Sequence, residues 1–250
     1  MERKKLSGKE RKARRKEDLI KKKVVDECVK VAYSKDDHLT EFPAFLKYQQ
    51  NGLDLKMESQ KGDTLSPSLK QYIQALLKLN MEGPYGTEWP AEEKIKRREM
   101  VATEARYIII RVTQGHDSGF SQDQYLWYGF GEPVVAFVQF RFVVEEDIPV
   151  LYVYELQLEK SVQGKGLGKF LMQLLELIAR KNNMRAILLT VQKRNTLAMN
   201  FYKKLRYAVS KISPSKVDPL VGAEKSYEIL CKAFDLEAKS KLEESLLQTN

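Results

Sequence analysis

The chain has 250 residues, of which 43% are apolar and 10% aromatic, enough to form a hydrophobic core and to exclude a largely disordered protein. No apolar run reaches the roughly 18 residues of a membrane-spanning helix, and the N-terminus lacks the apolar stretch of a secretory signal, so we expect neither. With only two cysteines and two histidines, the sequence predicts no disulfide framework and no metal site, which fits a reducing compartment.

The net charge of +9 is concentrated at the N-terminus. Residues 1–23 carry 12 Lys and Arg against 4 Asp and Glu, a net charge of +8, so the rest of the chain is nearly neutral. The clusters 14–16 and 21–23 are typical of a nuclear-import signal or of a contact with nucleic acid or the ribosome. The alternative is a solvated helix start that binds no partner.

Helical patterns occupy the first hundred residues. An apolar stripe at helical spacing predicts a helix that ends near Ser34. The stripe consists of Ile20, Val24, Cys28 and Val31. Ser66 and Pro67 are typical of the N-cap and first residue of a second helix. Residues 83–86 are predicted to form a turn, and a third, charged helix is expected over 89–101.

Strand patterns dominate the second half of the chain. The expected strands cover 106–111, 133–142, 150–158, 185–191 and 227–231. The expected helices cover 166–181 and 195–206, and a charged helical pattern follows at 235–247. Helices, then three strands in series, then alternating helices and strands predict an α+β fold with a mixed sheet, in which a helix crosses between adjacent strands.

The glycine-rich residues 113–132 are predicted to form a long loop. Its aromatic residues are expected to pack onto the body of the protein, with contact to a partner as the alternative; they are Tyr125, Trp127, Tyr128 and Phe130. The consecutive residues His116, Asp117 and Ser118 are not expected to form a hydrolytic triad, because neighbours in sequence do not readily adopt its geometry.

The turn 163–168 contains three glycines between a strand and an amphipathic helix. Such a turn lets the backbone approach a ligand, and the first N–H groups of the helix favour an anion, phosphate above all. A P-loop is excluded because Gln163 and Phe170 stand where it requires glycine and Ser or Thr. A dinucleotide fingerprint is excluded because the glycine spacing differs and the next strand ends without an acid.

The remaining pattern, Gln163-x-x-Gly166-x-Gly168, resembles the acetyl-CoA pyrophosphate loop of the GNAT acyltransferase superfamily. Downstream, Asn195-x-x-Ala198-x-x-Phe201-Tyr202 resembles the next helix of that superfamily. Further segments are similar to the NatD family, the N-alpha-acetyltransferases that act on histone N-termini. These segments are 42–45, 48, 51–53, 88–89, 140–142, 150–158, 165–171 and 226–230, within a similarity that spans about residues 40–231.

The resemblance implies a GNAT fold with an added N-terminal helical segment, and it divides the chain. The divisions are a basic tail at 1–23, a helical segment wrapping the core at 24–104, the acetyltransferase domain at 105–234 and a C-terminal extension at 235–250. It also implies acetyl transfer from acetyl-CoA to the N-terminal serine of histones beginning Ser-Gly-Arg-Gly, the histone-four and histone-two-A type. We expect a monomer that acts in the nucleus and cytoplasm.

The same resemblance assigns site residues by matching positions. Glu155 corresponds to the proposed general base, and Tyr202 to a tyrosine that protonates the leaving thiolate. The implied substrate-binding residues are Tyr85, Trp89, Glu145, Tyr152, Tyr154 and Tyr227. The implied cofactor-binding residues are Gln157, Leu158, Gln163, Gly164, Lys165, Gly166, Leu167, Gly168 and Asn195. Two features depart from the family. Val143 stands where an Asp contacts the peptide, so either Glu145, Glu146 or Asp147 replaces that Asp or the recognition is altered. The loop at 113–132 is also longer than the usual connection of the family.

The residues themselves leave alternatives open. A carboxylate in an apolar strand, such as Glu155, either meets solvent or lies in a functional pocket, and the nearby glycine turn favours the pocket. Tyr202 is either an acid for the thiolate or a packing aromatic beside Phe201, and Asn195 caps its helix. An α-amine titrates near 7.7–8.0, so it needs only modest help from a base.

Two rival functions remain. The first is a GNAT enzyme that acetylates lysine or a small amine. The second is a nucleic-acid-binding protein without catalysis, led by the basic tail at 1–23, although the nearly neutral body is a poor electrostatic ligand for phosphates.

Overall fold

The computed structural model describes residues 8–113, 126–127 and 129–243. Their strands form one mixed sheet of eight strands in the order β1-β2-β3-β4-β5-β6-β8-β7. The strands are β1 Lys47–Gln50, β2 Leu53–Lys61, β3 Arg106–Val112, β4 Val134–Glu145, β5 Ile148–Leu158, β6 Ala186–Gln192, β7 Ala208–Val209 and β8 Tyr227–Ala233. This arrangement confirms the predicted α+β class with a mixed central sheet.

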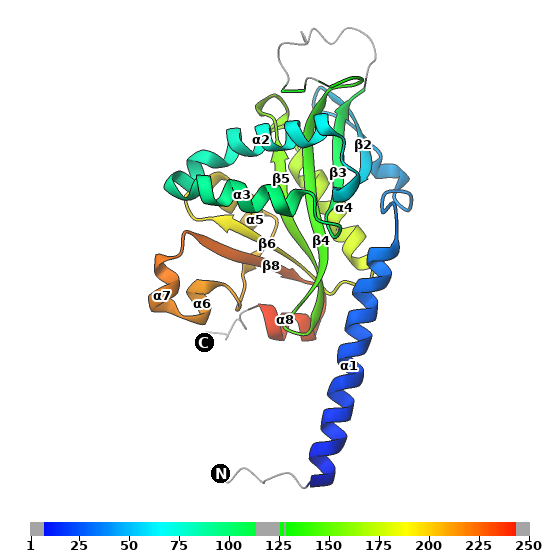
Figure 1. Ribbon diagram of the computed structural model, residues 1–250, viewed down its shortest axis with the longest axis vertical. Coiled ribbons are helices and arrows are strands. Elements are labelled where there is room, and N and C mark those ends of the chain that lie inside the picture. The colour runs from blue at the N-terminus through cyan, green and yellow to red at the C-terminus, as the bar shows by residue number, and fades with distance from the viewer. Residues whose placement is uncertain (1–7, 114–125, 128, 244–250) are drawn as a thin grey trace.

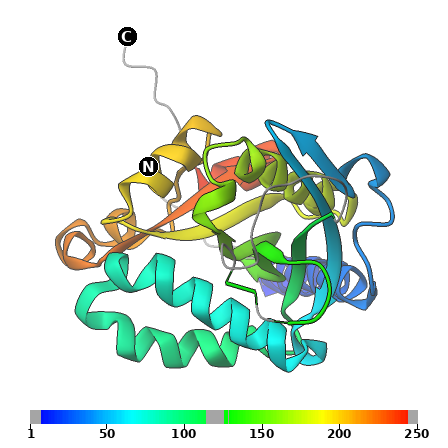
Figure 2. The ribbon, with the colours of Figure 1, turned by 90° about the horizontal axis from the view of Figure 1, so that it is seen from above.

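Helices cover both faces of the sheet (Figures 1 and 2). They are α1 Gly8–Ser34, α2 Pro67–Tyr85, α3 Trp89–Met100, α4 Leu167–Lys181, α5 Thr196–Lys204, α6 Pro214–Val217, α7 Pro219–Glu224 and α8 Leu236–Leu242. α2 and α3 lie on one face, and α4 and α5 lie on the opposite face (Figure 2). The core lies between these layers.

The predicted crossover helix is α4, which connects β5 to β6. These are the only parallel neighbours among the described strands. The apolar face of α4 is fully buried, as its spacing predicts; its members include Leu167, Leu171, Leu174, Leu175 and Ile178. A helix that crosses between parallel strands needs one apolar face to pack back onto the sheet.

β5 and β6 pair only along their first halves. Their register runs from Val150 opposite Ala186 to Val153 opposite Leu189, and no pairing follows. At the same place β5 contains a bulge against β4, because Gln139 faces Glu155 and the next β4 residue faces Val153. An extra residue bends a strand, so β5 turns away from β6 there.

In the first hundred residues one predicted turn is wrong and one hairpin was missed. The turn expected at 83–86 lies mostly inside α2, which continues to Tyr85 with Pro84 in its last turn. Gly86, at φ 57, ends the helix, because glycine adopts this conformation without steric cost. The hairpin β1–β2 was not predicted, although β2 alternates buried and more exposed residues from Leu53 to Met57.

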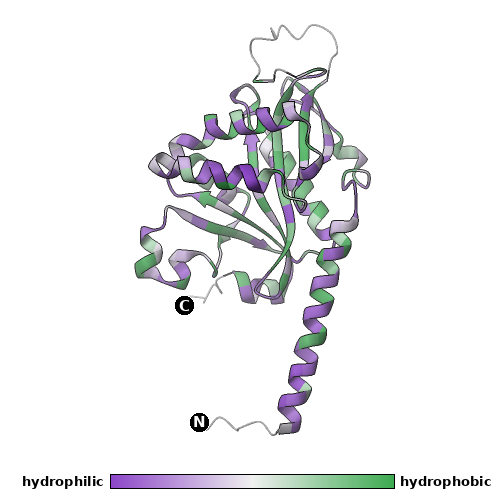
Figure 3. Ribbon diagram, in the orientation of Figure 1, coloured by the Kyte–Doolittle hydropathy of each residue, from purple (hydrophilic) through white to green (hydrophobic). Residues whose placement is uncertain are grey.

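α1 begins at Gly8 and projects from the body, with mostly polar residues along its length (Figures 1 and 3). The helix predicted to end near Ser34 is confirmed, but most of its apolar stripe does not pack against the body. Ile20, Val24 and Val31 are 53%, 64% and 53% exposed. The helix instead packs through residues 28–33, which contact β4 and β5 and include the buried Ala32.

The described part of the predicted loop packs onto the body through Trp127. Its ring is buried 6.0 Å from the Tyr72 ring, and the Arg111 guanidinium lies 5.0 Å from it. Phe130 is exposed. The other predicted loop residues, Tyr125, Tyr128 and residues 116–118, lie outside the described residues. Across the ranges that the structure describes, no helix has the length and hydropathy to cross a membrane.

Candidate active site

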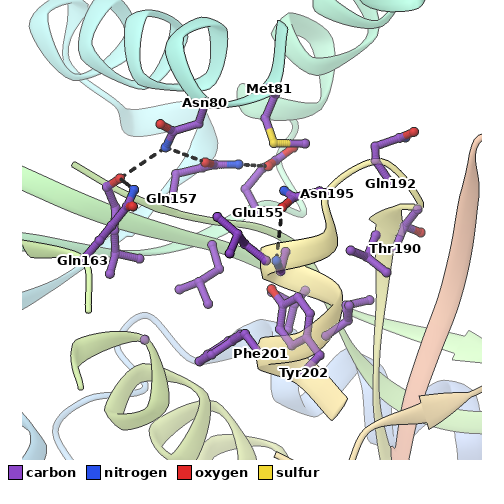
Figure 4. A pocket seen from close by; sticks show the side chains of 18 of the residues that line it. Asn80, Met81, Glu155, Gln157, Gln163, Thr190, Gln192, Asn195, Phe201 and Tyr202 are labelled. Atoms are coloured by element: carbon purple, nitrogen blue, oxygen red, sulfur yellow. Dashed lines mark hydrogen bonds between the residues drawn. The ribbon is translucent and has the colours of Figure 1, made fainter. Parts of the chain in front are cut away.

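A cavity of about 820 Å³ opens where β5 and β6 diverge (Figure 4). β5 supplies one wall with residues 153–158, and β6 supplies another with 189–192. α2 and α3 border the cavity from one face of the sheet, and α5 and the start of α4 border it from the other. Concave, partly apolar cavities with a few convergent polar groups are typical of ligand sites.

The turn 163–168 lies at the rim of this cavity and leads into α4. Gly164 and Gly166 have φ of 72° and 83°, which favour glycine. The first helical hydrogen bond joins the Phe170 N–H to the Gly166 carbonyl at 3.1 Å. The N–H groups of residues 167–169 therefore precede the hydrogen-bond ladder of the helix and favour an anion.

Glu155 is the centre of a polar network in the β5 wall (Figure 4). It is 6% exposed and forms an ion pair through Oε1 with Lys96 of α3, whose side chain is 12% exposed. Its Oε2 accepts a hydrogen bond from Gln157 Nε2 at 2.8 Å. Gln157 Oε1 accepts one from Asn80 of α2 at 3.0 Å. Glu155 thus lies in the cavity wall and not at the open surface.

The charge state of Lys96 is set by two opposed effects. Burial disfavours the ammonium, but the Glu155 carboxylate outweighs this effect and raises the pKa of Lys96 above its ordinary value. The Tyr85 ring lies 5.4 Å from the same ammonium. The cavity wall therefore holds a cation and a carboxylate in contact.

Tyr202 lines the cavity from α5. Burial and then the nearby Glu155 carboxylate raise the pKa of the Tyr202 phenol. Its ring also packs edge-on against Phe201, with centroids 5.0 Å apart. Both properties weighed from the sequence are therefore present, a packing aromatic ring and a position in the cavity wall.

Most of the predicted cofactor-binding residues line this cavity. They are Gln157, Leu158, Gln163, Gly164, Gly166, Gly168 and Asn195. Asn195 also caps α5, because its Oδ1 accepts from the Ala198 N–H at 3.1 Å. The Leu158 carbonyl accepts from Asn80 Nδ2 at 3.2 Å and from Gln163 Nε2 at 2.9 Å. Lys165 and Leu167 do not line the cavity, and Leu167 is fully buried in the core.

The predicted substrate-binding residues are only partly brought together. Tyr85 and Tyr154 line the cavity. Tyr152 lies beside it, with its ring 5.4 Å from Tyr154 and its hydroxyl 2.6 Å from Thr190 Oγ1. Glu145 and Tyr227 do not line the cavity but are among the electrostatic neighbours of Tyr152.

Two further expectations concern residues that lie away from the cavity. Trp89 is buried with its ring 5.9 Å from the Tyr85 ring. Glu146 and Asp147 form the β4–β5 turn at the opposite end of β5 from Glu155. Lys241 contacts both of them, at 2.9 Å to the Glu146 carbonyl and 4.0 Å to Asp147.

Sequence reasoning missed Lys96, Asn80 and Gln192. Lys96 belongs to a helix rich in charged residues, so no local signal separates it from Lys94 or Arg97. Asn80 lies in the last turns of α2, where an amide side chain is ordinary. The buried Oε1 of Gln192 has no hydrogen-bond partner among the described residues, although it belongs to a cavity-lining side chain.

The chain is similar in sequence and in fold to known acetyltransferases. The model described as the acetyltransferase (GNAT) family matches residues 76–207. The PaiA N-acetyltransferase of Thermoplasma acidophilum, solved with coenzyme A, is 18% identical in sequence. Its alignment covers 72% of this chain and 99% of the PaiA chain, with a TM-score of 0.45. NAA60 of Arabidopsis thaliana, solved with a bisubstrate analogue, is 12% identical, covering 72% and 100%, with a TM-score of 0.47. An acetyltransferase of Streptococcus agalactiae is 15% identical, covering 71% and 98%, with a TM-score of 0.48.

Proposed function

Because the chain belongs to the acetyltransferase (GNAT) family, which uses acetyl-CoA, we propose that its acceptor is the N-terminal serine amine of histones beginning Ser-Gly-Arg-Gly. The observation that supports this proposal best is that three residues matching the NatD family lie in the same cavity wall. Glu155, Tyr154 and Tyr85, all at positions that resemble the NatD family, line one cavity next to the glycine turn.

The residues present fit acetyl-CoA. The turn offers unpaired N–H groups at a helix start, which suit a diphosphate. Gly168 faces Phe201 closely, and an added Cβ would lie 3.2 Å from its ring, so a side chain there would require this ring to shift. When bound, acetyl-CoA supplies the thioester that the amine attacks and the thiolate that leaves.

Glu155 is the proposed general base. An α-ammonium must lose a proton before its nitrogen can attack, and a carboxylate in the cavity wall accepts that proton directly or through a water. The ion pair with Lys96 holds this carboxylate in the cavity wall. Because an α-amine is partly neutral at physiological pH, a carboxylate paired in this way is a sufficient base.

Tyr202 is the proposed acid that donates a proton to the leaving thiolate. A phenol is protonated at neutral pH, and burial and then Glu155 raise the pKa of Tyr202 further, so the proton is present when the thiolate forms. Tyr202 lines the same cavity as the glycine turn.

The rest of the peptide is proposed to follow the tyrosines away from the cavity. Tyr154 leads to Tyr152, and Glu145 is an electrostatic neighbour of both. Burial, and then Glu146, raise the pKa of Glu145. A cationic side chain nearby, such as the arginine of Ser-Gly-Arg-Gly, would favour the ionised form of the Glu145 carboxylate. Val143 supplies no charge, so Glu145 is the proposed replacement for the missing Asp.

Mass spectrometry of peptides incubated with acetyl-CoA tests the acceptor. A Ser-Gly-Arg-Gly peptide should gain one acetyl group on its α-amine. A longer peptide with this N-terminal sequence, a blocked α-amine and a free lysine should gain no acetyl group. Modification of that peptide would favour the lysine-directed rival. No product with either peptide, from a protein that binds coenzyme A, would reject the proposed acceptor and leave the family assignment intact.

A further inference from the structure

The hairpin β1–β2 contacts the glycine turn 163–168, which is more than 100 residues away in sequence. The Tyr48 hydroxyl donates to the Lys165 carbonyl at 2.5 Å, and Asn51 Nδ2 donates to the same oxygen at 3.0 Å. Tyr48 is buried. One carbonyl of the turn is therefore held by two donors from a distant hairpin.

The geometry of the hairpin places these donors firmly. Gln50 pairs with Leu53, so Asn51 and Gly52 form a two-residue turn, and their φ angles of 53° and 73° match the turn that asparagine and glycine favour. The Tyr48 ring packs edge-on against Phe170 of α4, with centroids 5.0 Å apart. The donors therefore come from a folded hairpin and not from a free loop.

Holding this carbonyl determines the direction of an N–H group. In a trans peptide the carbonyl and the following N–H point in opposite directions, and no described peptide bond is cis. The Lys165 carbonyl points toward the hairpin, so the Gly166 N–H points to the other side. Gly166 lines the cavity, and a Cβ added to it would lie 2.8 Å from the Tyr48 hydroxyl.

We propose that Tyr48 and Asn51 are positioning residues for the diphosphate of acetyl-CoA. They hold the Lys165 carbonyl away from the cavity, so that the Gly166 N–H stays available to the anion. A flip of this peptide would instead turn a carbonyl oxygen toward the negative charge. Both residues precede the range 76–207 that matches the family model, so this chain recruits an element outside that range to its cofactor site.

The proposal rests on the placement of the diphosphate at this turn and not on the identity of the acceptor. Two conservative variants test it by calorimetry with coenzyme A, which requires no acceptor. Tyr48→Phe keeps the ring against Phe170 and removes the donor. Asn51→Gly keeps the positive φ and removes the amide. Each should weaken coenzyme A binding by about 3- to 10-fold, the range expected for one net hydrogen bond.

Matched controls make the same substitutions elsewhere. Tyr33→Phe removes a buried hydroxyl that has no partner among the described residues. Asn183→Gly removes an exposed asparagine with φ 58. Both should bind coenzyme A within twofold of the unchanged protein. Equal affinity for coenzyme A in all four folded variants would overturn the proposal.

A second measurement compares the unchanged protein with the same two variants. In amide NMR spectra of the unchanged protein, inorganic pyrophosphate should shift the Gly166 and Gly168 resonances. In Tyr48→Phe and Asn51→Gly, the Gly166 shift should shrink while the Gly168 shift remains, because only the first peptide is held by the hairpin. If pyrophosphate did not shift the Gly166 amide resonance of the unchanged protein, the proposal would also be rejected. A histone peptide that is not acetylated would leave both results unaffected.

Discussion

Lys96 and Glu155 form a nearly buried ion pair in the wall of the cavity, although 59 residues separate them in sequence. Burying two charges is costly unless they pair and find further hydrogen bonds. Glu155 has such a bond from Gln157. The pair therefore holds a carboxylate beside a cation in a largely buried part of the cavity wall, and it links α3 to the reaction proposed for β5.

We expect Glu155→Gln to lower kcat for the Ser-Gly-Arg-Gly peptide by about 100-fold or more, the usual effect of removing a general base. The substitution keeps the size of the side chain, so coenzyme A binding by calorimetry should stay within about twofold. Steady-state kinetics with the peptide measures the first effect. A variant that retains a third or more of the activity would show that Glu155 is not the base.

Lys96→Met should change the pH profile of kcat/KM for the peptide, because the proposed base loses its ion-pair partner. The variant should also melt at a lower temperature, since an uncompensated buried charge remains. Lys94→Met is the control, an exposed lysine on the same helix. If both variants gave the profile of the unchanged protein, Lys96 would have no influence on the reactive carboxylate.

Gly166→Ala and Gly164→Ala separate strain from contact in the turn. Both positions have positive φ, so each alanine costs about 1–2 kcal/mol of backbone strain. At Gly166 the new Cβ also meets the Tyr48 hydroxyl, whereas nothing lies within 4 Å at Gly164. Calorimetry should therefore find the larger loss of coenzyme A affinity for Gly166→Ala. Equal losses would mean that the contact with the hairpin has no effect.

We expect the protein to lose stability in mild acid because His38 is buried. Burial, with Lys35 and Arg106 nearby, lowers the pKa of His38 to about 4 from an ordinary 6.5. Protonation therefore favours unfolding, so the stabilising effect is complete above pH 6.5 and is lost as pH falls toward 4. Urea unfolding should lose about 2 kcal/mol from this group between pH 7 and pH 5. His38→Gln should remove most of that pH dependence.

The control for this measurement is His116→Gln, which changes the only other histidine in the chain. It should retain the full pH dependence of unfolding. A His38→Gln variant whose stability falls as steeply as that of the unchanged protein would assign the effect to other groups.

Deleting residues 1–23 should leave kcat/KM for a short peptide within about twofold. α1 packs onto the body through residues 28–33, and its basic part projects away from the cavity (Figure 1). If these residues bind nucleic acid or the ribosome, the deletion should abolish a binding that weakens steeply with salt, because phosphate contacts release counterions. Loss of peptide acetylation would instead place the tail in the catalytic reaction.

The sequence by itself determined the features that arise from neighbouring residues. The buried face of α4, the caps at Ser66 and Asn195, and the glycine turn after β5 all follow from spacing or backbone preference within one segment. The mixed sheet followed from the order of these segments. Periodicity predicted the helix α1 but not the exposure of its apolar stripe, because periodicity reports which residues share a face but not whether anything packs against that face.

Only the tertiary structure decided which distant groups meet at the cavity. Lys96 contacts Glu155, Asn80 contacts Gln157 across 77 residues, and Tyr48 contacts Lys165 across 117. Lysine, asparagine and tyrosine are ordinary residues in their own segments, so no local pattern distinguishes them. Their roles arise because the bulge in β5 parts two parallel strands and the packing of α2, α3 and the β1–β2 hairpin then brings these side chains to the gap.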